Sequence, residues 1–108
     1  MKTVKTIPFP PPSLVTAKEF GRAVRAARTA TGMPLTQAAM VVGVATQTLQ
    51  DIETGTGTVA LSTALKVAHE LGASFFVIPS RQRSIVAHAI QSALSTSPLD
   101  LSINDARD

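Results

Sequence analysis

The stretch TQAAMVVGVATQTLQDIETG, residues 36–55, constrains the fold more than any other part of the chain. Ala39 has a small side chain that lets a second helix approach, and Gly43 permits a sharp turn between the two helices. Leu49 and Ile52 supply aliphatic side chains that fill the space between them. The spacing therefore predicts two short helices that cross at a steep angle, the second over residues 46–54.

Signals for helix ends surround this pair. Thr16 and Glu19 have the spacing of a capping box, which predicts that a first helix begins there. Gly32 suits the end of that helix, and Pro34 suits the first turn of the next, which should run to about Val42. Two further helices are indicated by apolar residues at helical spacing. These residues are Leu61, Leu65, Ala68 and Leu71 in the fourth helix, and Ile85, Val86, Ala89, Ile90, Ala93 and Leu94 in the fifth.

The segment SFFVIP, residues 74–79, has a different character. It is β-branched and aromatic and is stopped by Pro79, so it predicts a short strand. A single strand cannot satisfy its own backbone, so this one must pair with the N-terminal arm or with a second copy of itself. We favour the second copy, because a two-fold axis pairs a strand with itself in antiparallel fashion. The predicted dimer contacts are Ser74, Phe75, Phe76, Val77 and Ile78.

The predicted fold is all-α, with five helices in a helix-turn-helix arrangement and one C-terminal strand that forms an intersubunit sheet. Residues 1–15 form a proline-rich arm, either a disordered terminus or a strand at 3–7 if something pairs with it. Residues 16–72 form the helical domain, 73–95 the dimerisation strand and amphipathic helix, and 96–108 a flexible tail. A core of roughly 60–70 residues is marginal alone, which also favours a dimer.

Composition excludes several kinds of site and location. The chain has no cysteine, so neither a disulfide framework nor a cysteine-based zinc site is available. No apolar run reaches the roughly 18 residues of a membrane span, and the N-terminus lacks the apolar core of a secretory signal, so we expect a cytoplasmic protein. The net charge of +3 favours an anionic partner only mildly, but six of the ten lysines and arginines precede residue 29.

No pattern indicates catalysis. His69 and His88 are far apart in sequence and have no acidic or histidine cluster nearby. The GTGT segment at residues 55–58 lacks the lysine of a phosphate-binding loop, and turn chemistry explains it better. No histidine-plus-acid arrangement would activate a serine or threonine. We therefore expect neither an enzyme nor a metal site, and no cofactor.

The stretch RAVRAARTATGMPLTQAAMVVGVATQTLQDIETG resembles the Cro/repressor-type helix-turn-helix family, also called the xenobiotic-response-element family, within about residues 17–72. The following ALKVAHELGASFFVIPSR is similar to the HipB-type antitoxin branch, in which a short strand joins two subunits. The resemblance implies a homodimer that binds a palindromic double-stranded DNA operator, with a kinase-like toxin as a second candidate partner. The matching positions are Gly32, Ala39, Gly43, Val44, Thr48, Leu49, Ile52, Glu53 and Gly55.

The helix at residues 46–54 then supplies the base contacts, although it has no cation. Base edges are read by hydrogen bonds, and glutamine, threonine and aspartate all offer suitable groups. The predicted base readers are Thr46, Gln47, Thr48, Gln50 and Asp51, the last accepting from a cytosine amine. Attraction to phosphate must come from elsewhere. The predicted phosphate contacts are Arg22, Arg25, Lys66 and Thr36, although Arg22 and Arg25 equally fit an ordinary solvated face.

Arg28 and Glu53 are interpreted separately. The resemblance implies that they form a semi-buried structural pair, and the alternative is that Arg28 contacts phosphate.

Three hypotheses for function remain: a repressor homodimer, an antitoxin that also neutralises a toxin, and a protein-interaction module without strong DNA binding. Leu35 and Ala45 stand where the family often has Gln and Ser or Thr. Leu35 and the acidic character of residues 46–54 allow the third hypothesis.

Overall fold

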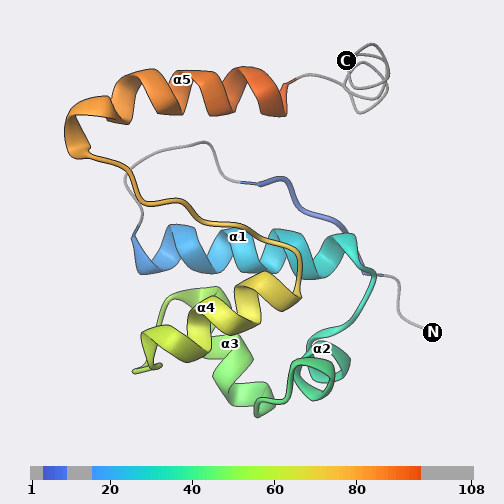
Figure 1. The fold of residues 1–108 in the computed structure, drawn as a ribbon. Helices are drawn as coiled ribbons and strands as arrows, with labels where there is room; N and C mark the ends of the chain where they lie inside the picture. The colour runs from blue at the N-terminus through green and yellow to red at the C-terminus, as the bar shows by residue number, and fades with distance from the viewer. Residues whose placement is uncertain (1–3, 10–15, 96–108) are drawn as a thin grey trace. The chain divides into compact units, whose positions relative to one another are not determined.

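A computed structural model of the chain describes residues 4–9 and 16–95 (Figure 1). Its helices are α1 (Ala17–Ala30), α2 (Leu35–Val42), α3 (Thr46–Thr54), α4 (Leu61–Glu70) and α5 (Arg83–Leu94), with a 3-10 turn, η1, at Ser80–Gln82. The five predicted helices are therefore present. The described residues divide into two compact units, one containing residues 4–9 and 16–75 and the other residues 76–95.

The first helix begins where its capping box predicts. The Thr16 side chain accepts a hydrogen bond from the Glu19 backbone N–H at 3.2 Å, and the Glu19 carboxylate accepts one from the Thr16 N–H at 3.1 Å. Two N–H groups that a helix start leaves unpaired are thus satisfied reciprocally. By contrast, no side-chain hydrogen bond caps the starts of α2, α3 or α4.

The turn between α2 and α3 depends on Gly43. Its φ of 76° is in the left-handed region, which a residue with a side chain adopts only at a cost. The Gly43 and Val44 N–H groups donate to the carbonyls of Met40 and Ala39 and so close the end of α2. Two residues follow Gly43 before α3 begins, so the turn between the two helices is short.

The core of the first unit lies between α1 and the three helices that Figure 1 shows on one side of it. The largest fully buried side chains are Val24, Val42, Leu49 and Val67, one from each of the four helices. Ala38 and Ala39 are also buried, and their small side chains let α2 and α3 pack closely. The small–Gly–aliphatic pattern thus describes the packing correctly.

The helices α1 and α3 approach each other most closely at two glycines. A Cβ added at Gly21 would collide with the carbonyl oxygens of Ile52 and Glu53, at the end of α3. A Cβ added at Gly55 would lie 2.7 Å from the Lys18 backbone nitrogen, at the start of α1. Both distances are below any normal carbon contact, so the two backbones are in direct contact here.

The strand predicted at residues 74–79 is not shown: the structure assigns residues 73–79 to no helix or strand. A strand is defined by its hydrogen-bonded neighbour, and one chain does not supply the second copy that the prediction requires. Phe75, expected at a dimer contact, stacks on Phe20 of α1 with ring centroids 4.5 Å apart. Phe76 and Val77 are exposed.

Residues 4–9 of the N-terminal arm are in neither a helix nor a strand. The Ile7 N–H donates to the Thr29 hydroxyl of α1 at 3.3 Å, and that hydroxyl donates to the Ala26 carbonyl at 3.1 Å. This part of the arm therefore contacts the first helix. The rest of the arm and the predicted tail at 96–108 lie outside the described residues.

In the second unit, α5 follows directly from η1. None of its residues is buried, and Ile85 and Leu94 are 71% and 63% exposed. No described helix has the length and apolar character to cross a bilayer.

Candidate nucleic-acid interface

The two faces of α3 differ sharply. Leu49, Ile52 and Glu53 are buried, while Gln47 and Gln50 are exposed. Thr46, Thr48 and Asp51 are half-buried. The exposed glutamines are three residues apart, which places them side by side on the helix surface. Five predicted base readers thus lie on one short helix, but only the two glutamines are fully exposed on it.

Gln47 and Asp51 are joined. The Gln47 side-chain amide donates through Nε2 to the Asp51 Oδ1 at 2.9 Å. The Asp51 carboxylate also lies beside the loop that follows α3, since a Cβ added at Gly57 would be 2.7 Å from its Oδ2. Asp51 is therefore held between its helix and a loop, which differs from the predicted role of a free acceptor for cytosine.

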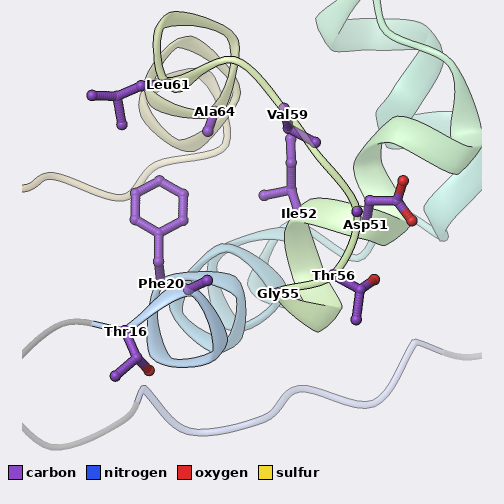
Figure 2. A pocket seen from close by; sticks show the side chains of 11 residues that line it. Thr16, Phe20, Asp51, Ile52, Gly55, Thr56, Val59, Leu61 and Ala64 are labelled. Carbon is purple, nitrogen blue, oxygen red and sulfur yellow. The ribbon is translucent and has the colours of Figure 1, made fainter.

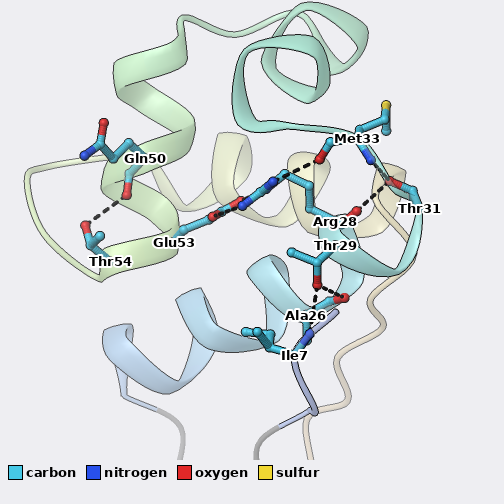
Figure 3. A network of polar contacts seen from close by, with 9 residues as sticks. All are labelled: Ile7, Ala26, Arg28, Thr29, Thr31, Met33, Gln50, Glu53 and Thr54. Carbon is cyan, nitrogen blue, oxygen red and sulfur yellow. Dashed lines mark hydrogen bonds and ion pairs between the residues drawn. The ribbon is translucent and has the colours of Figure 1, made fainter. Parts of the chain in front are cut away.

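The other face of α3 is fixed by Arg28, as Figure 3 shows. The Arg28 Nε donates to the Glu53 Oε2 at 2.6 Å, and a second guanidinium nitrogen donates to the Glu53 Oε1 at 3.0 Å. The third nitrogen donates to the Met33 carbonyl at 2.9 Å. The two side chains are only 9% and 6% exposed. A buried bidentate pair thus connects α1, the α1–α2 turn and α3. Every nitrogen of the guanidinium already donates to a protein oxygen, and its burial keeps it away from a phosphate.

Arg22 and Arg25 lie on the exposed side of α1. Neither forms a hydrogen bond or ion pair with another described residue. Together with Lys18, which is also exposed, they follow the i, i+4, i+7 spacing of one helix face. Thr36 is exposed at the uncapped start of α2, where backbone N–H groups remain available to an anion.

A family model described as helix-turn-helix, of the Cro/C1 type, matches residues 24–78. The match covers about half of the chain and includes α1 from Val24, the α2–turn–α3 pair and α4. The chain belongs to the helix-turn-helix family. No curated protein and no solved structure matches it. The HipB-like antitoxin branch is not supported by the family match, and it stays a hypothesis.

Within this helix-turn-helix domain, Lys66 was predicted to contact phosphate, but its ammonium contacts other residues of the domain. Its ammonium donates to the Val42 carbonyl, the last of α2, at 3.2 Å and pairs with Glu70 at 3.2 Å. A cation at the C-terminal end of a helix satisfies an orphan carbonyl and interacts favourably with the helix dipole. Lys66 therefore joins α4 to the turn of the motif, which makes a structural role sufficient to explain it.

Leu35 stands where the family often has a glutamine, and the structure gives a reason. Its side chain is half-buried and packs against the core cluster. The first residue of α2 thus contributes to folding, and any anchoring of phosphate at this helix end falls to backbone N–H groups and Thr36.

Gly21 is the residue that the sequence interpretation missed. Its signal was present, because a glycine inside a helix costs about 1 kcal/mol relative to alanine and needs a packing reason. The structure supplies that reason in the close approach of α3. Gly57 was likewise interpreted only as a turn residue, although it lies against the Asp51 carboxylate.

A groove of about 320 Å³ lies between the start of α1, the end of α3 and the start of α4 (Figure 2). Its lining is mainly apolar, with Phe20, Ile52, Val59 and Leu61, and Asp51 is its one ionisable residue. Such a lining has no pair of groups for acid–base or nucleophilic chemistry. Among the described residues, no group of three potential ligands is placed to hold a metal ion.

Proposed function

We propose that this chain is a sequence-specific DNA-binding transcription regulator that acts as a homodimeric repressor. The observation that carries the proposal is the surface of α3: its apolar residues are buried in the domain, and Gln47 and Gln50 extend outward. A helix-turn-helix domain places the N-terminal part of this second helix in the major groove. Both glutamines then face base edges, where an amide can donate and accept at once.

Phosphate contacts supply the attraction that α3 itself lacks. This role is supported by the uncapped start of α2 and by the exposed Arg22 and Arg25 of α1, which have no partner among the described residues. Arg28 does not belong to this set, because its guanidinium is committed to Glu53 and Met33. Such contacts set affinity and its salt dependence but carry no sequence information.

Replacing Gln47 or Gln50 with alanine should relax base preference at one position in each half-site. The expected loss of discrimination is roughly 1–3 kcal/mol at that base pair, because a bidentate amide contact disappears. Competition binding against duplexes selected from a random library, each altered at one base pair, measures it. An equal loss of affinity on selected and random DNA would show that these glutamines do not read bases.

The homodimer is supported by exposed apolar side chains at residues 76–78. Phe76 and Val77 are 81% and 102% exposed, and Ile78 is 36% exposed. Contiguous exposed apolar residues indicate a contact with another surface. Two copies of residues 74–79 paired antiparallel would bring these side chains together and pair the backbone groups on the facing edge of each strand.

Sedimentation should therefore show a dimer at micromolar concentration. Changing Phe76 to Asp should shift the chain to monomer, because a buried charge near the two-fold axis would meet its own copy. The control is Ser84→Asp, which adds the same charge on the exposed surface of α5, outside residues 74–79. Val59→Asp is a poor control, because Val59 is half-buried in the α3–α4 loop. A wild-type chain that stays monomeric at these concentrations contradicts the dimer.

An alternative is a protein-interaction module that neutralises a partner, as an antitoxin neutralises a kinase-like toxin. The observation in its favour is α5, which has no buried residue and exposes Ile85 and Leu94. An amphipathic helix of this kind can dock in an apolar groove of another protein. An antitoxin that also binds its operator is compatible with the repressor, whereas the interaction module lacks strong DNA binding. The absence of salt-dependent DNA binding would therefore favour the interaction module.

A further inference from the structure

We infer that Asp51 is a positioning residue, which fixes the orientation of the Gln47 amide and thereby makes Gln47 select adenine over guanine. The inference rests on the proposed function, because it concerns how α3 would read one base pair. It replaces the earlier expectation that Asp51 itself accepts from a cytosine amine. The Gln47–Asp51 hydrogen bond of 2.9 Å is its starting point.

The chemistry of a carboxylate decides which way the amide points. An ionised carboxylate only accepts hydrogen bonds, so the Gln47 NH₂ must face Asp51 and its oxygen must face away. A glutamine without such a partner presents either end of its amide with equal ease. Gln47 is therefore left with one acceptor, its Oε1, and one remaining N–H.

The loop after α3 keeps Asp51 in place. The Thr56 N–H donates to the Asp51 carbonyl at 3.0 Å, which ties the loop to the helix at this residue. Gly57, with a φ of 70°, leaves open the space beside the carboxylate, where a Cβ would lie 2.7 Å from Oδ2. The orientation of Gln47 thus depends on residues on both sides of the end of α3.

The remaining groups of Gln47 match one purine. Adenine offers an amine donor and the N7 acceptor in the major groove, which pair with one acceptor and one N–H. Guanine offers two acceptors, O6 and N7, and both would need donors. One of the two Gln47 N–H groups is occupied by Asp51, so a guanine acceptor would face the amide oxygen.

The test is a double-mutant cycle on DNA binding. The wild type, Asp51→Asn, Gln47→Ala and the double variant are measured on duplexes selected by the wild type from a random library. Each duplex is used with adenine and with guanine at the position that Gln47→Ala identifies. Asparagine keeps the size of Asp51 but permits either orientation of the amide, so the preference for adenine should fall roughly tenfold. In the Gln47→Ala background, Asp51→Asn should leave the adenine-to-guanine ratio unchanged.

Glu70→Gln is the control, since it removes one exposed negative charge without touching α3. It should leave the ratio at the wild-type value, although affinity for all duplexes can rise. Additive effects of the two substitutions would overturn this inference but leave the proposed function standing. A change of preference at a different base pair would do the same, because it would mean that Asp51 contacts a base itself. An unchanged ratio in Asp51→Asn overturns it too. A wild type that binds all duplexes equally overturns the proposed function as well.

Discussion

Arg28→Ala should destabilise the domain by about 3–5 kcal/mol, because it leaves the Glu53 carboxylate buried without its partner. A domain of this size has roughly 5–15 kcal/mol of stability in total, so the loss is a large part of it. The substitution also removes the hydrogen bond to the Met33 carbonyl, which joins the α1–α2 turn to the pair. Thermal and urea unfolding followed by circular dichroism measures the effect.

Two companion variants separate charge from packing. Glu53→Gln keeps the shape of the side chain and removes its charge, so it should cost less than Arg28→Ala. Replacing both Arg28 and Glu53 with methionine should restore much of the stability, because no buried charge remains unpaired. If Arg28→Ala keeps the unfolding midpoint and instead flattens the salt dependence of DNA binding, Arg28 contacts phosphate and the structural pairing does not explain it.

Among substitutions that add a single methyl group, Gly21→Ala should be one of the most destabilising in the domain. The added carbon collides with the carbonyl oxygens of Ile52 and Glu53, and backbone atoms cannot rotate away as a side-chain end can. Overpacking of this kind typically costs about 1–3 kcal/mol and sometimes more. Without the collision, alanine would stabilise the helix by about 1 kcal/mol relative to glycine. Whether Gly21→Ala lowers or raises the stability therefore shows whether the collision or the helix propensity is larger. The unfolding midpoint in urea measures it.

Gly43→Ala is the matched control for this prediction. Gly43 has a φ of 76° and no atom within 4 Å of an added Cβ, so alanine there meets conformational strain without a collision. That strain costs about 1–2 kcal/mol. A Gly21 variant that is more stable than the wild type would show that α1 and α3 separate easily, which contradicts their close backbone contact. DNA affinity should fall with Gly21→Ala even where the chain stays folded, since α3 would shift.

The helices could be predicted because their limits are local. The capping box at Thr16 and Glu19, the turn at Gly43 and the end of α3 at Gly55 all depend on residues within one turn of each other. The Arg28–Glu53 pair came from the family resemblance, and the structure brings both residues together. Spacing alone would not have joined residues 25 positions apart.

The roles of Lys66 and Asp51 could not be obtained in the same way. Lys66 meets the Val42 carbonyl only after α4 has folded across the turn, which no local pattern encodes. Gln47 and Asp51 are four residues apart, a spacing that does predict contact on a helix, but each was interpreted alone as a base reader. The strand predicted at residues 74–79 depends on a neighbour outside one chain. Its sequence therefore indicates a tendency to form a strand but does not say with which segment it pairs.

Binding of the wild-type chain to DNA at several salt concentrations tests the central claim most directly. Its two probes are a duplex selected from a random library and a shuffled duplex of the same composition. Affinity for both should fall as salt rises, and Arg22→Ala should lower the slope by about one unit per lost contact in each half-site. The selected duplex should bind at least about 10³-fold tighter than the shuffled one. Equal affinity for the two duplexes, or no salt-dependent binding at all, would contradict sequence-specific recognition by α3.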